Sequence, residues 1–239
     1  MEITISKLNK NFGSKTALED VNLQIKIGMF GLLGRNGAGK TTLMRILTTL
    51  LTKTSGNISI CGIPIERTRE IRRIVGYLPQ DFSMYPNMTV YDAMDYIGVL
   101  SEIPLKVRRR IVPELLDKVN LYDCQKVRIR ALSGGMKRRL GIAQAIINDP
   151  KVLIVDEPTA GLDPEERVRF KKLLKNTSEN KIVILSTHII EDIEETCEKV
   201  AILNNGRVIY NGNTEKLATM DSSNSTILGG YMKLMGGNM

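Results

Sequence analysis

The chain has 239 residues, of which 42% are hydrophobic and 25% are charged, and this composition indicates a globular protein of one or two domains and excludes intrinsic disorder. No internal period indicates a repeat solenoid, no run approaches the roughly 18 apolar residues of a membrane-spanning helix, and the N-terminus lacks the apolar core of a secretory signal. The 34 Lys and Arg exceed the 26 Asp and Glu by +8, which either favours anionic partners such as nucleotides, nucleic acid or acidic lipid, or only keeps the chain soluble.

Short β-branched runs alternate with longer helical patterns along the chain, which is typical of an α/β protein with a largely parallel sheet. Helices are expected to begin after Gly39, Pro164 and Ile189, where the apolar spacing becomes helical. The turn sequence Asn204-Asn205-Gly206 predicts a hairpin between the last two strands. The predicted strands cover residues 3–5, 30–33, 58–61, 74–78, 152–155, 182–185, 200–203 and 207–210.

The strongest motif is the run Gly34-Arg35-Asn36-Gly37-Ala38-Gly39-Lys40-Thr41, which fits the phosphate-binding pattern G-x-x-x-x-G-K-[ST]. It follows an apolar run and begins a helical one, which is the strand–loop–helix context that such a loop requires. Its glycines let backbone N–H groups face a phosphate, and the helix start adds unpaired donors. Lys40 is therefore expected to reach the β- and γ-phosphates of a nucleotide, and the Thr41 hydroxyl to bind Mg²⁺.

Residues 81–147 are predicted to form a mostly helical insertion between two strands of the sheet. Near its end, the run Leu132-Ser133-Gly134-Gly135-Met136 precedes an amphipathic helical pattern. Ser133 is a good N-cap residue, and Gly134 and Gly135 leave amides exposed, so this helix start is a second candidate anion site. Within one copy a second phosphate site is redundant, so it is expected to serve a different copy of the chain.

The segment KVLIVDEP at 151–158 predicts a buried strand that ends in Asp156 and Glu157. Open α/β sheets bind ligands at this end of their strands. Asp156 suits a Mg²⁺ site, directly or through water, and Glu157 points the other way and is the candidate general base. An acidic pair at a strand end is more often only a solvated end of the strand. Beside a phosphate loop, the functional interpretation becomes the favoured one.

His188 is the only histidine in the chain, and it follows another predicted strand in the string LSTH. A single histidine is more often structural than functional. Its expected position beside the γ-phosphate favours a role as a hydrogen-bonding sensor.

Taken together, these motifs resemble those of the nucleotide-binding subunit of an ABC (ATP-binding cassette) transporter, over about residues 2–218. The segment GRNGAGKTT resembles the Walker A motif, LSGGM the signature, LIVDEP the Walker B motif, GLD at 161–163 the D-loop, and STH the switch histidine. Gln80 in GYLPQ resembles the Q-loop glutamine. Phe12 lies where the family stacks an aromatic ring on adenine.

The resemblance implies an α/β fold: a P-loop NTPase core of the ABC ATPase type with an antiparallel β portion. It assigns residues 1–220 to the ATPase domain, with a helical subdomain at about 81–147 to which Gln80 is the hinge. Residues 221–239, rich in Gly, Met and Ser, are expected to form a loose tail of unknown role or a short docking segment, in which Tyr231, Leu234 and Met235 offer apolar positions.

The resemblance further implies two ATP molecules between two copies of the chain, or between this chain and a similar one. Each ATP then lies between one copy's Walker A and the other's signature. The implied catalytic residues are Glu157, His188 and Gln80, and Thr41, Gln80 and Asp156 are the implied Mg²⁺ ligands. ATP is expected on Phe12, Gly34, Arg35, Asn36, Gly37, Ala38, Gly39, Lys40, Thr41 and Thr42, with Ser133, Gly134, Gly135 and the D-loop Asp163 acting from the other copy.

Two residues depart from the family pattern. Arg35 stands where proline or serine is usual, and whether it contacts ATP or solvent stays open. Met136 replaces the commoner glutamine after the signature glycines and leaves their amides intact. Neither change removes a catalytic group, so both sites are expected to be competent.

The expected function is ATP-driven dimer closure that powers transport, with export favoured, through membrane subunits on a separate chain. Cys61, Cys124 and Cys197 form neither a disulfide framework nor a zinc spacing, which suits a reducing cytosol. The resemblance implies that the chain lies in the cytoplasm, at the inner face of the cell membrane. One alternative is an ABC ATPase that acts on nucleic acid, although this chain has neither a long coiled coil nor a second cassette. The other is a sensor that binds ATP without turnover, which has no need of Glu157 or His188.

Overall fold

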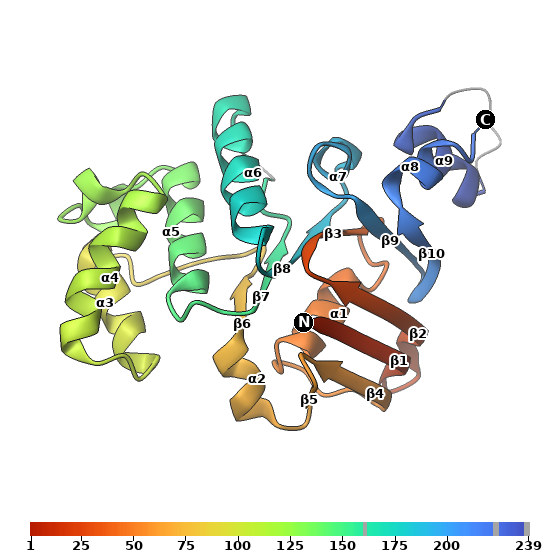
Figure 1. The fold of residues 1–239 in the computed structure, drawn as a ribbon, viewed down its shortest axis with the longest axis horizontal. Helices are drawn as coiled ribbons and strands as arrows, with labels where there is room; N and C mark the ends of the chain where they lie inside the picture. Colours follow the sequence, from red (N-terminus) through yellow and green to blue (C-terminus); the bar gives the residue numbers. More distant parts are fainter. Residues whose placement is uncertain (160–161, 222–224, 237–239) are drawn as a thin grey trace.

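The computed structural model describes residues 1–159, 162–221 and 225–236, which form two β-sheets with helices packed around them (Figure 1). The strands are β1 (Glu2–Phe12), β2 (Lys15–Lys26), β3 (Gly28–Leu33), β4 (Ser55–Ile60), β5 (Ile63–Pro64), β6 (Val75–Leu78), β7 (Val152–Asp156), β8 (Ile182–Thr187), β9 (Lys199–Asn204) and β10 (Arg207–Asn213). The helices are α1 (Lys40–Leu47), α2 (Thr68–Ile74), α3 (Val90–Leu100), α4 (Leu105–Lys118), α5 (Gly134–Ile146), α6 (Pro164–Ser178), α7 (Ile190–Thr196), α8 (Thr214–Ala218) and α9 (Ile227–Leu234), with short 3₁₀ turns η1 (Tyr122–Cys124) and η2 (Ile129–Ala131). None of the helices in these described ranges is both long and apolar enough to cross a lipid bilayer.

The larger sheet has the strand order β10-β9-β3-β8-β7-β6, and its strands are parallel except for β10. Every residue of β7 and β8 is buried, which explains why these strands are almost continuous apolar runs in the sequence. The predicted parallel α/β arrangement is confirmed. Asn205 and Gly206 both have positive φ in the turn between β9 and β10, which confirms the predicted hairpin.

The smaller sheet is antiparallel, with the order β2-β1-β4-β5, and it covers α1 (Figure 1). Strand β2 was not among the predicted strands. Its residues Val21, Leu23 and Ile25 are buried on one side and alternate with exposed neighbours, and β2 pairs with β1 through contacts such as Ile3 with Ile25. This period-two alternation was the signal that could have located the strand.

Between β6 and β7 the chain leaves the larger sheet and forms α3, α4 and α5, which lie together at one end of the molecule (Figure 1). All of residues 81–147 are described, and they contain no strand beyond an isolated bridge between Thr89 and Arg128. Helix α5 packs directly on β6, where a Cβ atom added at Gly76 would lie 2.0 Å from the carbonyl oxygen of Ala145. The helical segment is therefore held firmly against the strand that precedes it.

Residues 225–236, expected to form a loose tail or a short docking segment, contain helix α9 and pack on the rest of the chain. Thr226 caps α9 by accepting a hydrogen bond from the Gly229 amide at 3.1 Å. Gly230 allows α9 to approach α8, since a Cβ atom there would lie 1.9 Å from the carbonyl oxygen of Leu217. Tyr231 and Leu234 pack against the chain's own core. The high glycine content thus serves close helix packing here.

Candidate active site

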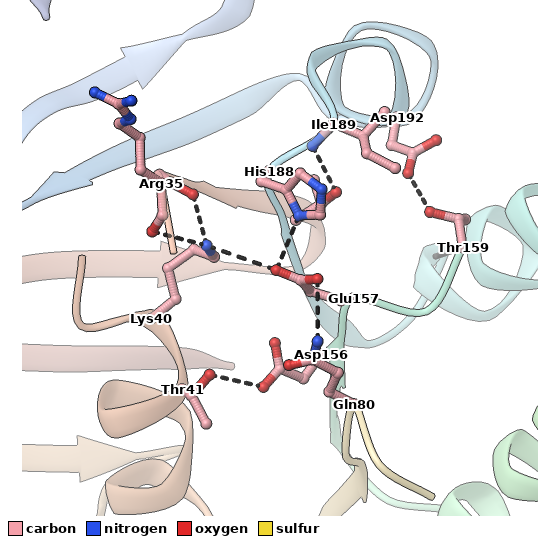
Figure 2. Close-up of polar contacts among 12 residues, drawn as sticks. Arg35, Lys40, Thr41, Gln80, Asp156, Glu157, Thr159, His188, Ile189 and Asp192 are labelled. Carbon is pink, nitrogen blue, oxygen red and sulfur yellow. Dashed lines mark hydrogen bonds and ion pairs between the residues drawn. The ribbon is translucent and has the colours of Figure 1, made fainter. Parts of the chain in front are cut away.

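Four strands of the larger sheet end beside one cleft of about 720 Å³. The phosphate loop follows β3, Gln80 follows β6, Asp156 and Glu157 end β7, and His188 follows β8 (Figure 2). Parallel strands bring their carboxyl ends to the same edge of a sheet, so these segments meet as the sequence predicted. The residues that line the cleft are Phe12, Lys15, Thr16, Ala17, Arg35, Asn36, Gly37, Gly39, Lys40, Thr41, Thr42, Gln80, Glu157, Asn205 and Gly206.

The phosphate loop depends on glycine where its backbone turns. Gly37 and Gly39 have φ of 81° and 110°, values that residues with a Cβ atom rarely adopt. Gly39 immediately precedes α1 and provides no side-chain cap, so the first amides of the helix have no intrahelical acceptor. The start of α1 therefore offers the donors and the partial positive charge that a phosphate needs.

Lys40 is buried between this loop and the acidic pair. Its Nζ donates to the carbonyl oxygens of Gly34 at 2.5 Å and Arg35 at 3.3 Å, and it lies 3.8 Å from Oε1 of Glu157. Burial lowers the pKa of the Lys40 ammonium, while the carboxylates of Glu157 and Asp156 act in the opposite direction. A cation thus lies where the β- and γ-phosphates of a nucleotide are expected.

The carboxylate oxygens of Asp156 are available to coordinate a cation. Its Oδ2 accepts a hydrogen bond from Thr41 Oγ1 at 3.1 Å, and its buried Oδ1 has no hydrogen-bond partner among the described residues. Burial raises the pKa of Asp156, and the nearby hydroxyls of Ser186 and Thr41 partly oppose this effect. Mg²⁺ prefers oxygen ligands and is usually held by one or two carboxylates together with substrate phosphates, so the residues present fit this ion.

No group of three or more His, Cys, Asp and Glu side chains within the described ranges is arranged to hold a metal ion by itself. A cation beside Asp156 would therefore complete its coordination with phosphate oxygens and water. This is the usual arrangement at nucleotide sites.

Glu157 is the centre of the polar contacts in Figure 2. Its Oε1 lies 3.0 Å from Nδ1 of His188, and its Oε2 accepts a hydrogen bond from Gln80 Nε2 at 3.4 Å. Glu157 is only 6% exposed. The structure brings together the three residues that the family resemblance named as catalytic.

Other predicted site residues lie outside the cleft lining. Gly34 serves packing, because a Cβ atom there would lie 2.4 Å from the carbonyl oxygen of Leu203, and Ala38 is buried. Ser133 caps α5 as predicted, accepting a hydrogen bond from the Met136 amide at 3.2 Å. Ser133, Gly134 and Gly135 do not line the cleft of the same chain.

The D-loop is described only in part. Asp163 caps α6 by accepting a hydrogen bond from the Glu166 amide at 2.8 Å. Residues 160–161, which include the predicted D-loop glycine, lie outside the described residues. Asp163 does not line the cleft of its own chain.

Phe12 lines the cleft, is 49% exposed, and has Lys10 Nζ 4.8 Å from the centroid of its ring. Sequence reasoning did not include the neighbouring residues 15–17 or the hairpin turn in the cleft. Gly206 of this turn donates to the carbonyl oxygen of Ala38 at 2.9 Å, which joins the turn to the phosphate loop. The turn itself was predicted from the sequence, but nothing in its spacing indicated this contact.

A family model described as ABC transporter matches residues 18–160. The chain belongs to the ABC transporter family, as an ATP-binding subunit. The Nod factor export ATP-binding protein I of Cupriavidus pinatubonensis is 39% identical over 218 residues, which is 90% of this chain and 67% of that protein. The ABC transporter ATP-binding protein YxlF of Bacillus subtilis is 35% identical over 235 residues, 98% of this chain and 78% of that protein.

Solved structures confirm the ABC ATPase fold. The ATP-binding subunit of an ABC transporter has a TM-score of 0.88 at 26% identity, covering 98% of this chain and 100% of that one. A dimeric structure of the ATP-binding cassette MJ0796, bound to ADP and phosphate, has a TM-score of 0.80 at 27% identity, covering 88% and 98%. The chain is therefore a nucleotide-binding protein of the ABC ATPase type.

Proposed function

We propose that this ABC subunit hydrolyses ATP with Mg²⁺ to power export through membrane subunits on a separate chain. The export relatives, which include Nod factor export proteins, support this direction of transport. The contact of Glu157 with both His188 and Gln80 carries the proposal, because a purely nucleotide-binding protein has no need of a buried carboxylate held in this way.

ATP would bind with its phosphates against the start of α1 and Lys40, and with its base on the exposed ring of Phe12. The remaining loop residues, Gly34 to Thr42, provide backbone amides and the loop shape. Arg35 is exposed at the cleft and adds a further cation to those of Lys15 and Lys40. These contacts explain ATP binding, and the general-base step of hydrolysis is assigned to Glu157.

Thr41, Asp156 and Gln80 would hold the magnesium ion, which when bound supplies positive charge that offsets the charge developing on the phosphates. Glu157 would accept a proton from a water molecule as the water oxygen attacks the γ-phosphorus. The bond to the bridging oxygen then breaks, releasing ADP and phosphate. His188, whose side chain is 45% exposed, would hold the Glu157 carboxylate and reach the γ-phosphate.

The second half of each site would come from another copy. The start of α5, with Ser133, Gly134 and Gly135, does not line the cleft of its own chain. The same is true of Asp163, which caps α6. We propose that two copies, or this chain and a similar one, close on two ATP molecules so that each signature completes the opposite site. In this arrangement residues 1–220 act as the ATPase domain, with 81–147 as its helical subdomain, at the inner face of the cell membrane.

The test is ATP turnover by the purified chain with Mg²⁺, compared with E157Q and K40A. Removing a general base is expected to lower kcat by about 10²–10⁴-fold. E157Q should lose turnover to this extent while ATP still binds, and K40A should lose ATP affinity. Turnover by E157Q at the parental rate would contradict the assignment of Glu157 as the base.

A further inference from the structure

The side chain of Arg138, on α5, joins three parts of the molecule. Its guanidinium donates four hydrogen bonds to carbonyl oxygens outside the helix: Nε to Pro158 at 3.0 Å, Nη1 to Pro79 at 3.4 Å and to Gln80 at 2.5 Å, and Nη2 to Glu157 at 2.5 Å. A guanidinium has five N–H donors in a rigid, planar fork. Most of this capacity is therefore used on backbone carbonyls near the active site.

These carbonyls belong to the two segments that carry Gln80 and Glu157. One segment follows β6 and the other follows β7, just beyond Leu78 and Val155, the last paired residues of these neighbouring strands. The side chains of Gln80 and Glu157 meet at 3.4 Å in the cleft. Arg138 thus binds the main chain of the same two residues whose side chains contact each other.

The backbone of Glu157 needs such support. Its φ of 46° lies in the left-handed region, which a residue with a side chain occupies only when its surroundings enforce it. Its amide donates to the carbonyl oxygen of Ser186 at 2.8 Å, and its own carbonyl accepts from Arg138. Together these two hydrogen bonds hold the peptide groups on both sides of Glu157 and so fix the direction in which the carboxylate points.

We propose that Arg138 is a positioning residue for hydrolysis: it holds the backbone of Glu157 and Gln80 at a fixed offset from α5. The same helix begins with the signature residues Gly134 and Gly135. A movement of the signature would therefore also move the backbone of Glu157, through the hydrogen bond that Arg138 donates to it. The inference rests on the proposed function, because it requires Glu157 to be the base.

Three variants separate this role from general stabilisation of the fold. R138M keeps most of the apolar stem and removes every donor. R138K keeps the charge, but its three N–H donors radiate from one nitrogen and cannot reproduce the fork. R108M is the matched control, because Arg108 is also half-buried, pairs with Asp95 at 2.8 Å and donates to a carbonyl oxygen, that of Ile103, at 2.7 Å, all within the helical segment.

The measurements are kcat and KM for ATP, the dissociation constant of ATP, and the melting temperature. A displacement of the base by about 1 Å costs on the order of 10²-fold in rate, so R138M should lose about that much kcat. The kcat of R138K should lie between the values for R138M and the parent. The ATP dissociation constant should stay within about threefold of the parent, and R108M should lower the melting temperature while it keeps the parental kcat.

A folded R138M with the parental kcat would overturn the proposal. So would an equal loss of kcat in R108M, or a loss of ATP affinity as large as the loss of kcat, because either result indicates general loosening. If R138M does not fold, R138K is judged by the same criteria. A parent that does not hydrolyse ATP, or an E157Q variant that does, would instead refute the proposed function, and the role of Arg138 with it.

Discussion

Nδ1 of His188 lies 3.0 Å from Oε1 of Glu157, although 31 residues separate them in the chain. The contact follows from the sheet: β7 and β8 are adjacent and parallel, with Asp156 opposite Ser186, so both strands deliver their next residues to the same place. The carboxylate is nearly buried and the imidazole is partly exposed. His188 is thus placed to orient the Glu157 carboxylate.

Replacing this imidazole tests the contact directly. H188A should lower kcat by about 10²-fold, the lower end of the range for a group that takes part in proton transfer, because Glu157 loses its orienting partner. ATP affinity should change little, since Lys40 and the loop amides remain. Steady-state kinetics combined with equilibrium ATP binding measures both quantities. A variant that loses affinity and keeps kcat would mean that His188 serves nucleotide binding.

The ionised carboxylate of Asp156 is expected to lower the free energy of unfolding at neutral pH, although turnover with Mg²⁺ needs it. Burial raises its pKa, so the folded state holds the proton more readily than the unfolded state does. Its contribution to the free energy of unfolding therefore decreases as the pH rises from the ordinary Asp pKa through the raised value. At neutral pH, D156N should be more stable than the parent by roughly 0.5–2 kcal/mol and should lose Mg²⁺-dependent turnover.

Urea unfolding across a pH series measures this effect. The difference between D156N and the parent should shrink as the pH falls toward about 3.9, where the ordinary carboxyl also becomes protonated. If D156N is less stable than the parent at neutral pH, the ionised carboxylate stabilises the fold and this account of its burial is wrong.

The buried polar cluster of Lys171, Asp192 and Thr159 should be strongly destabilised when it loses its cation. Lys171 Nζ lies 2.7 Å from Asp192, which is 0% exposed and also accepts a hydrogen bond from the Thr159 hydroxyl. K171M leaves this carboxylate buried without its counter-ion, which costs about 3–5 kcal/mol. Urea unfolding should show that loss, and the K171M/D192N double variant should lose less than the sum of the single changes. K172M, at an exposed position of the same helix, should stay within about 0.5 kcal/mol of the parent.

Cysteine reactivity should separate the three thiols. Cys197 is 5% exposed, and burial raises the pKa of its thiol to about 12, whereas Cys61 and Cys124 are partly exposed. Because only the thiolate reacts, a thiol reagent at pH 8 should modify Cys61 and Cys124 in the folded protein and Cys197 only after unfolding. Mass spectrometry of digested, labelled protein identifies the sites. Rapid labelling of Cys197 in the native state would show that α7 opens readily.

Much of the candidate site could be predicted because its chemistry lies in short runs of sequence. The phosphate loop, the Asp156–Glu157 pair and His188 each follow a predicted strand, and a parallel sheet brings these ends together without further information. Strand β2 was missed although Val21, Leu23 and Ile25 alternate. Helix α9 was missed because its glycines, which allow close packing on α8, also weaken a helical pattern.

The buried polar contacts could not be predicted. Arg138 stands in the basic run Lys137-Arg138-Arg139, where nothing in the sequence indicates a buried contact, yet it binds carbonyl oxygens up to 59 residues away. Asp192 and Thr159 are separated by 33 residues and meet only because α7 packs beside the segment that follows β7. Such contacts depend on the relative placement of elements, which neither spacing nor composition specifies.

In the proposed function, one chain carries two incomplete halves of a nucleotide site, and ATP joins two chains. The most direct measurement is the mass of purified E157Q by sedimentation velocity, with and without ATP. Bound ATP that cannot be cleaved should convert monomers to dimers, and a second change, S133R, which places a bulky cation at the signature, should abolish that shift while leaving ATP bound. E157Q that binds ATP and remains monomeric, both alone and with its membrane subunits, would contradict the account.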